Sequence, residues 1–490
     1  MNTVLSFLNK DRESITKRDI IKFIKYKEIR AINFRYIAGD GRLKTLNFPA
    51  TDLKYVDRIL SCGERVDGSN LFKDIDISSS DLYVIPRYST VFESPFSPIP
   101  SIDIMANFFN KDGSFFESAP DYILLKAQEK FKEITKYEIN TFGELEYYVI
   151  SSKNDFYPMN AQKGYHESYP FNKWENLRVE AMDLISKIGG KVKYAHSEVG
   201  FIRSEDKEMS QNEIEFLPDL PLYSAYQLLI SKWILHSLGL KYGVIITFAP
   251  KISIGHAGSG LHIHISVLKN GKNVMIKNSG LSDEAKKLIS GLINIAKSST
   301  AFGNTLPTSY LRLVPNQEAP IRISWGYRNR SALIRVPLGW TTNKDMSSTV
   351  NKIEKSSTKH PHNQTIEFRS GDGSANIPFY IASLICGALS GFEMKNFSEF
   401  SKKYFIDKNI FHKENKDIRD KFDSLPSSCY ESSLELIKSR NIYEKHSIFP
   451  PSVIDSFVKK LQSYDDKNLS ERLYGKEEEI KKLIEEYLYC

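Results

Sequence analysis

The feature that most constrains this chain is a set of expected strands with polar side chains at alternate positions. In "GSGLHIHISV", His262, His264 and Ser266 alternate with apolar residues behind a glycine-rich turn. Successive side chains on a strand point to opposite faces, so these three share one face. The spacing recurs in "GELEYY" (Glu144, Glu146), "HSEV" (Glu198), "QNEIEF" (Glu213, Glu215) and "TIEFRS" (Glu367, Arg369). One face of a sheet therefore carries many polar groups.

Taken singly, each of these strands has a simpler interpretation. Glu144 and Glu146 alone would suit an exposed edge strand, and an isolated histidine on a strand usually belongs to the core or the surface. Acidic and imidazole faces on at least five strands would repel one another unless cations lay between them. Carboxylates with one imidazole suit Mg²⁺ or Mn²⁺, whereas zinc prefers more imidazole or thiolate. The assembly of strands therefore predicts a metal site.

A second feature is the density of arginines in "SYLRLVPNQEAPIRISWGYRNRSALIRVP". This stretch holds one acidic residue, Glu318, and five arginines, which are Arg312, Arg322, Arg328, Arg330 and Arg335. A basic surface loop is the simplest alternative, but planar guanidinium groups beside a metal site favour an anionic substrate. Pro315 and Gly326 favour a mobile flap over a rigid strand. Metal ions with arginines meet the needs of phosphoryl transfer, and no Walker loop or dinucleotide fingerprint is present.

The order of expected elements indicates two units. Residues 28–50 read as a hairpin, "DLYVIP" and "SIDIMANFF" read as strands, and Pro120 opens a helix, which together give a small strand-rich unit ending near residue 115. From Phe142 onward short strands alternate with long helices, expected at 173–188, 223–239, 282–299 and 377–390. The tail beyond residue 400 is expected to be helical and charged.

Composition excludes several other classes of protein. With 490 residues, 41% hydrophobic and 26% charged, the chain is expected to be globular and soluble. The net charge of +7 comes from 67 basic and 60 acidic residues that are interspersed, which argues against a nucleic-acid partner. No signal peptide or membrane span is recognised, so a cytoplasmic location without a membrane partner is expected. Cys62, Cys386, Cys429 and Cys490 are too scattered for a disulfide framework or a zinc cluster.

The motifs also form a collinear set over nearly the whole chain. In order they are "VDGSN", "GELEYY", "KGYH", "HSEV", "QNEIEF", "GSGLHIHIS", "RLVPNQEAP", "RNRSALIRVP" and "EFRSGDGSAN". This set resembles the type I glutamine synthetase family. The resemblance implies an α+β fold, with an N-terminal β-grasp domain at 1–115 and a catalytic ATP- and metal-binding domain at 116–490 whose antiparallel sheet forms part of a shared funnel. It further implies a homo-oligomer, a double hexameric ring, with active sites shared between subunits.

The resemblance also implies a role for each site residue. Metal ligands would be Glu146, Glu198 and Glu213 for the ion on the acid and amine side, and Glu144, His262 and Glu367 for the ion on the nucleotide phosphates. Asp67, from the adjacent subunit, would deprotonate ammonium held by Tyr165 and Glu198. Glu318 would close the flap. The remaining contacts would be Gly258, Arg312 and Arg369 with the acid, Arg330 and Arg335 with phosphate, and His264 and Ser266 with the nucleotide.

The implied reaction is the ATP-dependent ligation of glutamate and ammonia. The side-chain carboxylate of glutamate is phosphorylated, and ammonia attacks the acyl phosphate once it has lost a proton. Metal ions and arginines would stabilise the anionic transition states, and flap closure would protect the intermediate from water. ATP and Mg²⁺ or Mn²⁺, with two or more ions per site, are therefore the expected cofactors.

Several positions depart from the family pattern. Ala257 replaces an asparagine that helps to hold glutamate, Asn70 replaces a serine on the ammonium side, and Thr365 replaces an arginine near the phosphates, for which His360 or His362 could substitute. The segment 199–212 is expected to be a long loop near the metals, and Phe411 stands where regulated members carry an adenylylated tyrosine. Two alternatives stay open. One is a ligase for a larger amine or a related acid, against which Asp67 argues modestly; the other is a non-catalytic relative, against which the complete ligand set argues.

Overall fold

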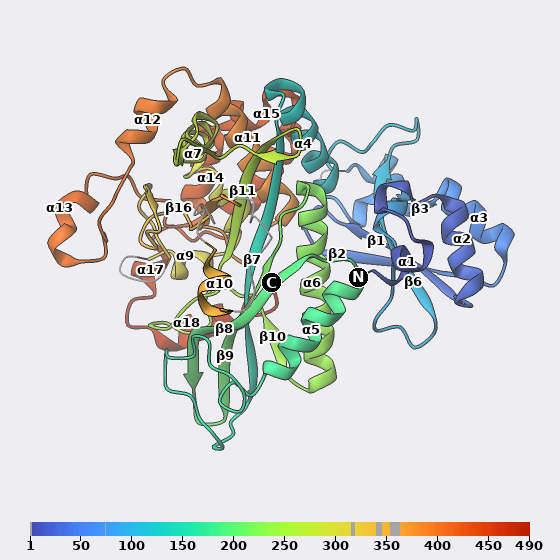
Figure 1. The fold of residues 1–490 in the computed structure, drawn as a ribbon, viewed down its shortest axis with the longest axis horizontal. Coiled ribbons are helices and arrows are strands. Elements are labelled where there is room, and N and C mark those ends of the chain that lie inside the picture. Colours follow the sequence, from blue (N-terminus) through green and yellow to red (C-terminus); the bar gives the residue numbers. More distant parts are fainter. Residues whose placement is uncertain (1, 74, 315–318, 340–344, 353–362) are drawn as a thin grey trace.

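Two β-sheets organise the chain (Figure 1). The computed structural model describes residues 2–73, 75–314, 319–339, 345–352 and 363–490. The first sheet has the strand order β2, β1, β6, β4, β3, with β5 paired to β6. Its strands are β1 (Ala31–Ile37), β2 (Leu43–Pro49), β3 (Glu64–Asp67), β4 (Asp81–Pro86), β5 (Phe92–Glu93) and β6 (Ser101–Phe109). The antiparallel pairing of β1 with β2 confirms the predicted hairpin.

Three short helices complete this N-terminal unit, and the sequence analysis did not predict them. They are α1 (Thr3–Leu8), α2 (Lys17–Tyr26) and α3 (Leu53–Cys62). The α2 helix starts with a capping box in which the side chains of Thr16 and Asp19 each bond the backbone of the other. Ile20 and Phe23 of this helix are fully buried in one core with Phe34 of β1. The boundary predicted at residue 115 falls between β6 and α4 and remains a prediction.

The second sheet carries the candidate site. Its order is β15, β16, β17, β11, β7, β9, β8, with β10 paired to β7 and β12 to β11. The strands are β7 (Glu138–Ser152), β8 (Val192–Arg203), β9 (Lys207–Phe216), β10 (Ile245–Thr247), β11 (Leu261–Lys269), β12 (Lys272–Asn273), β15 (Trp325–Tyr327), β16 (Ile334–Val336) and β17 (Ile366–Phe368). A separate pair consists of β13 (Ile276–Lys277) and β14 (Gly280–Leu281). The expected strands of the catalytic unit are thus joined in one sheet.

Helices pack against the strands of this sheet. They are α4 (Pro120–Thr135), α5 (Glu175–Lys187), α6 (Pro221–Tyr242) and α7 (Asp283–Ile295), and α11 (Ile377–Glu393) packs on α4, α6 and α7. Three short helices also belong to this part of the chain, α8 (Thr300–Gly303), α9 (Ser309–Arg312) and α10 (Met346–Val350). Leu145, Ile214 and Ile263 are fully buried in the same core as Leu228 of α6. At Gly143 a Cβ atom would lie 2.8 Å from the Leu228 side chain, so glycine permits close packing of β7 on α6. The polar residues that alternate with these apolar ones therefore face the other side.

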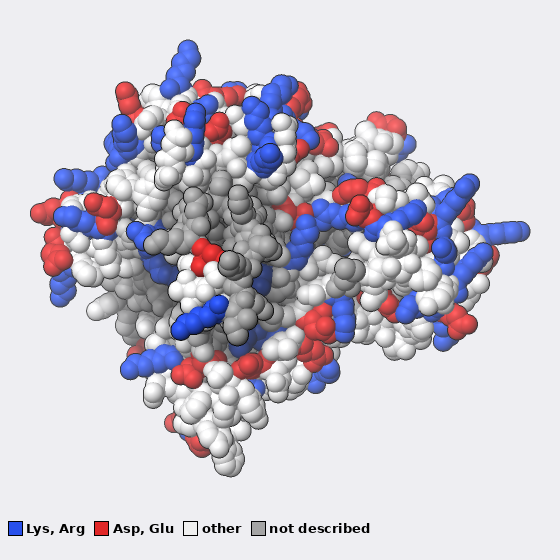
Figure 2. All heavy atoms as spheres, viewed as in Figure 1, with Lys and Arg blue, Asp and Glu red and all other residues white. Residues whose placement is uncertain are grey.

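The C-terminal tail is helical, as predicted. Its helices are α12 (Phe397–Lys403), α13 (Lys416–Arg419), α14 (Cys429–Lys438), α15 (Arg440–Glu444), α16 (Pro451–Gln462), α17 (Leu469–Arg472) and α18 (Glu477–Glu486). Within the described part of the chain, no single helix has both the length and the apolar character to cross a membrane; only α11 and α12 together, bent by 120°, meet that test. Figure 2 shows basic and acidic side chains interspersed over the face in view.

Two predictions about loops are wrong. Segment 199–212 is not a loop, because β8 and β9 form an antiparallel hairpin in which Phe201 pairs with Ser210 and Arg203 with Glu208. Ser204 closes its turn by bonding Lys207 through the backbone at 2.9 Å. Gly326 does not form a mobile loop either, since it lies in β15 and pairs with Arg335 of β16. A Cβ atom there would lie 2.4 Å from the Ile406 carbonyl, so close packing explains this glycine.

Candidate active site

A cavity of about 660 Å³ opens on the polar face of the second sheet. It is lined by residues of β7, β8, β9 and β11 and by the segments around Arg312, Arg330 and Arg369. Most of the predicted site residues meet there. They are Glu144, Glu146, Tyr165, Glu198, Glu213, Gly258, His262, His264, Arg312, Arg330, Arg335 and Arg369. Strand alternation predicted the glutamates, the histidines and Arg369 of this set. The arginine-rich stretch predicted Arg312, Arg330 and Arg335, and the family resemblance implied Tyr165 and Gly258.

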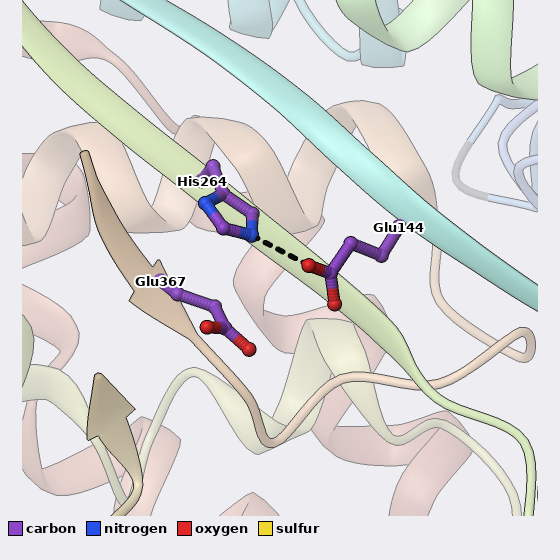
Figure 3. A group of neighbouring side chains, drawn as sticks. All are labelled: Glu144, His264 and Glu367. Atoms are coloured by element: carbon purple, nitrogen blue, oxygen red, sulfur yellow. Dashed lines mark hydrogen bonds and ion pairs between the residues drawn. The ribbon is translucent and has the colours of Figure 1, made fainter. Parts of the chain in front are cut away.

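Glu144, His264 and Glu367 form the first carboxylate group, with ligand atoms within 4.8 Å of one another (Figure 3). Sheet register brings them together, because His262 lies opposite Glu144 on β7 and His264 lies opposite Glu367 on β17. His264 Nε2 is 2.9 Å from Glu144 Oε1, and His262 Nδ1 is 2.7 Å from Glu144 Oε2. His264, which was predicted to contact the nucleotide, is therefore as well placed as His262 to bind a metal here.

Positive groups surround the first carboxylate group. Burial acts to raise the pKa of Glu144, but the charges of His264 and His262 and their hydrogen bonds outweigh it and hold that pKa well below its usual value. Burial and repulsion from Glu144 also oppose ionisation of Glu367, yet Arg369, His264 and Arg335 lower its pKa. Arg335 and Arg369 contact the Glu367 carboxylate at 2.8 and 2.9 Å. Both carboxylates are consequently ionised near neutral pH.

His196, Glu198 and Glu213 form a second group, whose ligand atoms also lie within 4.8 Å of one another. His196 Nε2 is 3.3 Å from Glu213 Oε1, and its Nδ1 is 3.7 Å from Glu198 Oε1. The pKa of Glu213 is raised well above its usual value, first by burial and then by repulsion from Glu144, Glu146, Glu198 and Glu215. Such a cluster ionises fully only beside an added positive charge. The donor set of carboxylates and imidazole suits Mg²⁺ or Mn²⁺.

Glu146, predicted as a ligand beside Glu198 and Glu213, is held by two protein donors. Its Oε2 accepts hydrogen bonds from the Gly260 backbone N–H at 2.7 Å and from Gln211 Nε2 at 3.0 Å. Its Oε1 lies 3.8 Å from His262 Nε2. Glu146 therefore stands between the two carboxylate groups, with one oxygen anchored to the protein.

Two site residues were missed by the sequence analysis. His196 lies two positions before Glu198, and Gln211 lies two positions before Glu213, so each shares a strand face with a predicted ligand. The alternation rule applied one step further along β8 and β9 would have found both. The pKa of His196 is lowered, chiefly by burial and also by the charges of His166 and Arg178, which favours the neutral imidazole that binds metals.

The arginines separate into two sets. Arg312 donates to the Ser370 carbonyl at 2.8 Å, and Arg369 donates to the Arg330 carbonyl, which fixes both at the cavity wall. Burial tends to lower the pKa of Arg330, but the charges of Tyr165, Glu367, Glu144 and Glu198 raise it overall. Arg322 does not join them, because its guanidinium bonds the Phe422 carbonyl and Asp420 instead. Of the five arginines in the arginine-rich stretch, Arg312, Arg330 and Arg335 line the cavity, and Arg322 and Arg328 are not among the lining residues.

Asp67 and Ser266 are not among the described residues that line the cavity. Asp67 ends β3 in the N-terminal sheet, where hydrogen bonds from Ser69, Ser80 and Asn70 lower its pKa. Asn70 Nδ2 donates to Asp67 Oδ2 at 2.6 Å. The asparagine that replaces the family's serine therefore orients the carboxylate of Asp67, the predicted base. Ser266 is buried on β11. Glu318, His360 and His362 lie outside the described residues.

The other departures also have structural consequences. The Thr365 hydroxyl lies 2.9 Å from His264 Nδ1. The residue that replaces the family's arginine therefore orients the imidazole of His264. Ala257 contributes only a methyl group at the cavity, and its backbone N–H and C=O bond Gln162 and Tyr148, each at 2.8 Å. Phe411 lines the cavity and packs with Ile406, Ile410 and Phe422. It has no hydroxyl to modify.

Comparison with known proteins identifies relatives over most of the chain. A family model described as "Glutamine synthetase, catalytic domain" matches residues 116–477, and one described as "Glutamine synthetase, beta-Grasp domain" matches residues 28–111. The Glutamine synthetase of Pyrococcus furiosus is 30% identical over 420 residues, covering 85% of this chain and 87% of the relative. That of Thermotoga maritima is 29% identical over 435 residues, covering 86% and 90%.

Solved structures share the fold at lower identity. The Plasmodium falciparum glutamine synthetase has a TM-score of 0.75 at 20% identity, covering 93% of this chain and 97% of that one. A structure described as "Apo GmaS without ligand" has a TM-score of 0.73 at 19% identity, covering 91% and 96%. Together with the family models, these matches confirm the predicted β-grasp domain followed by a catalytic domain.

Proposed function

The chain belongs to the glutamine synthetase family of ligases, and we propose that it joins glutamate and ammonia to form glutamine through γ-glutamyl phosphate. One observation supports this proposal above the others. Two carboxylate groups face a single cavity in which the pKa of Glu213 is raised by burial and by its acidic neighbours, while four arginines line the wall. This combination suits divalent cations that bind a multiply charged anion.

Family membership implies ATP and divalent metal ions, and the donor set fits them. We assign one ion to Glu144, Glu367 and either His262 or His264, and another to Glu198 and Glu213 with Glu146 or His196. When bound, these ions would neutralise charge on the phosphates and on the attacked carboxylate. The carboxylates themselves orient the ions, because hydrogen bonds from His262, His264 and Gln211 fix their rotamers.

The arginines and the glycine turn bind the anionic partners. Arg312 and Arg369 are placed to hold the carboxylates of the acid, beside Gly258. Arg330 and Arg335 also line the cavity, and we assign them to the γ-phosphoryl group that passes to the side-chain carboxylate of glutamate, where they would stabilise its charge in the transition state. The bond from the γ-phosphorus to ADP breaks as the bond to the carboxylate oxygen forms. Attack of ammonia on the acyl carbon then releases that oxygen with inorganic phosphate.

Ammonium must lose a proton before its nitrogen can attack as ammonia. Tyr165 and Glu198 line the cavity and are placed to hold an ammonium ion. Asp67 is ionised at neutral pH, because its hydrogen bonds lower its pKa, and it lies on the N-terminal unit. We therefore propose that Asp67 of an adjacent subunit receives the proton, which requires a homo-oligomer such as a double hexameric ring. Glu318 would close the site against water.

A second candidate function is ligation of a larger amine. Tyr165, Tyr194 and His196 line the main cavity and also a neighbouring hollow of about 400 Å³. The hollow offers space beyond the ammonium side, where the body of a primary amine could pack against the stacked rings of Tyr165 and His166. Ala257 also leaves the acid without the amide contact that the family pattern would supply.

The test is a product assay with matched arginine variants. Purified protein is mixed with ATP, Mg²⁺ or Mn²⁺, glutamate, and then ammonium or a series of primary amines, and the product is identified by mass. The proposal is supported if glutamine forms faster than any other amide. The second candidate is supported if an amide forms only with larger amines. Both are refuted if no product forms with any amine. Arg330→Met should lower turnover by a factor of about 10²–10³. Arg322→Met, outside the cavity, should leave turnover nearly unchanged.

A further inference from the structure

We propose that Gln211 is a positioning residue that couples Glu146, a proposed metal ligand, to the glycine turn at residues 257–260, where the acid substrate would be received. This inference deepens the proposed function and rests on it for the identity of the acid. Gln211 lies on β9, is 2% exposed, and stands opposite Tyr148 of β7. A buried side-chain amide needs partners for all its polar atoms, and those partners define what it holds together.

The amide of Gln211 joins three separate segments. Its Nε2 donates to Glu146 Oε2 and to the Gly258 carbonyl, both at 3.0 Å, and its Oε1 accepts from the Gly200 backbone N–H at 3.1 Å. Glu146 also accepts from the Gly260 N–H at 2.7 Å. One carboxylate oxygen of a proposed metal ligand is therefore tied to both ends of the turn. Any shift of Glu146 toward a bound ion must be transmitted to Gly258 and Gly260.

The surroundings leave Gln211 little freedom to adopt another position. A Cβ atom on Gly200 would lie 1.9 Å from the Tyr148 hydroxyl and 2.6 Å from Gln211 Oε1, so only glycine permits this approach. Tyr148 in turn donates to the Ala257 carbonyl at 2.8 Å. A Cβ atom on Gly258 would lie 2.4 Å from the Pro250 carbonyl. The turn is thus packed from both sides, and the Gln211 amide links its Gly258 carbonyl to the Glu146 carboxylate.

A second glutamine provides a matched comparison. Gln162 Oε1 accepts from the Ala257 N–H at 2.8 Å, and its Nε2 donates to the Phe201 carbonyl at 3.3 Å. Gln162 therefore holds the same turn, but among the described contacts it has none with Glu146. Both glutamines support the turn, and of the two only Gln211 contacts Glu146, adding to the bond that the Gly260 N–H makes to the same carboxylate. Replacing each glutamine by methionine, which has a similar size, therefore distinguishes loss of support for the turn from loss of its link to Glu146.

The experiment measures hydrogen exchange at residues 257–260 in the full chain, with and without Mn²⁺, and confirms Mn²⁺ binding by electron paramagnetic resonance. No turnover is needed, so failure of the proposed reaction would leave this test intact. In the wild type, Mn²⁺ should slow exchange of the turn by a factor of about 5 or more. In Gln211→Met the turn should exchange faster and Mn²⁺ should slow it clearly less than in the wild type, because only the Gly260 N–H then links the turn to Glu146.

Gln162→Met is the control. Its turn should also exchange faster, because Ala257 loses its acceptor, but Mn²⁺ should still slow the exchange as in the wild type. The proposal is overturned if Mn²⁺ protects the turn equally in Gln211→Met, or if it has no effect on the wild type. If Gln211→Met fails to fold, Gln211→Glu takes its place, because it keeps the side-chain size and the oxygen that accepts from the Gly200 N–H. Protection of the turn by Mn²⁺ equal to that of the wild type in this variant would also overturn the proposal.

Discussion

Replacing Glu213 by glutamine should stabilise the metal-free protein. The ligand atoms of Glu198 and Glu213 lie within 4.8 Å of each other, and at an effective dielectric constant of about 20 two unit charges at that separation repel by about 3 kcal/mol. Glutamine removes this repulsion and keeps an oxygen for His196, whose Nε2 is 3.3 Å from Glu213 Oε1. In the wild type, protonation of Glu213 relieves part of this repulsion. The increase in the free energy of unfolding caused by Glu213→Gln therefore depends on pH.

The sign of that dependence follows from the direction of the shift. The folded-state pKa of Glu213 is raised, by burial first and by its acidic neighbours next, so the folded state holds this proton more tightly than the unfolded state. The stability it gives is fully present below the unfolded pKa and is lost as pH rises through the folded pKa. Glu213→Gln should therefore change the free energy of unfolding little at about pH 5 and raise it by about 2–3 kcal/mol at about pH 8.

The assay is urea unfolding of metal-free protein at both pH values, repeated with Mn²⁺. The control is Glu208→Gln on the same strand, because Glu208 is buried and paired with Lys173 at 2.8 Å, and its loss should destabilise the protein. Mn²⁺ should stabilise the wild type more than Glu213→Gln. The reasoning is refuted if Glu213→Gln destabilises the metal-free protein at about pH 8, or if its effect is the same at both pH values.

Three further predictions concern the site. Glu318→Ala should leave ATP binding nearly intact while lowering amide formation and raising ATP hydrolysis without product; unchanged synthesis would contradict the flap role. Gly200→Ala should cost about 1–3 kcal/mol in urea unfolding, because its Cβ would lie 1.9 Å from the Tyr148 hydroxyl; wild-type stability would show that the hairpin adjusts. Thr365→Val should weaken Mn²⁺ binding measured by calorimetry, because His264 loses a partner at 2.9 Å, and unchanged affinity would contradict that link.

The sequence predicted which side chains face the cavity but not how they pair. Strand periodicity placed His262, His264 and Glu144 on polar faces, and the structure shows them lining one cavity. Register decides the contacts: His264 lies opposite Glu367, and His262 lies opposite Glu144. The register depends on which strands are neighbours, here in the order β17, β11, β7, β9. Pairing between segments far apart in the sequence sets that order, and the spacing of residues along one strand does not reveal it.

Local rules account for the other differences. The hairpin of β8 and β9 was predicted as a loop because its charged turn, closed by Ser204 and Lys207, interrupts the apolar pattern. The α2 helix carries a readable signal, the capping box of Thr16 and Asp19, and would have been found by searching for it. Gly326 was taken as a flexible point, although close packing against Ile406 requires a glycine there. A glycine can mark either a close approach of two segments or a flexible point of the backbone, and the sequence does not distinguish the two.

An isotope measurement tests directly whether the carboxylate of glutamate is phosphorylated before the amide forms. Glutamate labelled with ¹⁸O in its side-chain carboxylate is converted with ATP and ammonium, and the inorganic phosphate is analysed by mass. One ¹⁸O atom should appear in the phosphate for each amide formed, because the acyl phosphate releases a carboxylate oxygen on attack by ammonia. Amide formation with unlabelled phosphate would contradict phosphorylation of the carboxylate.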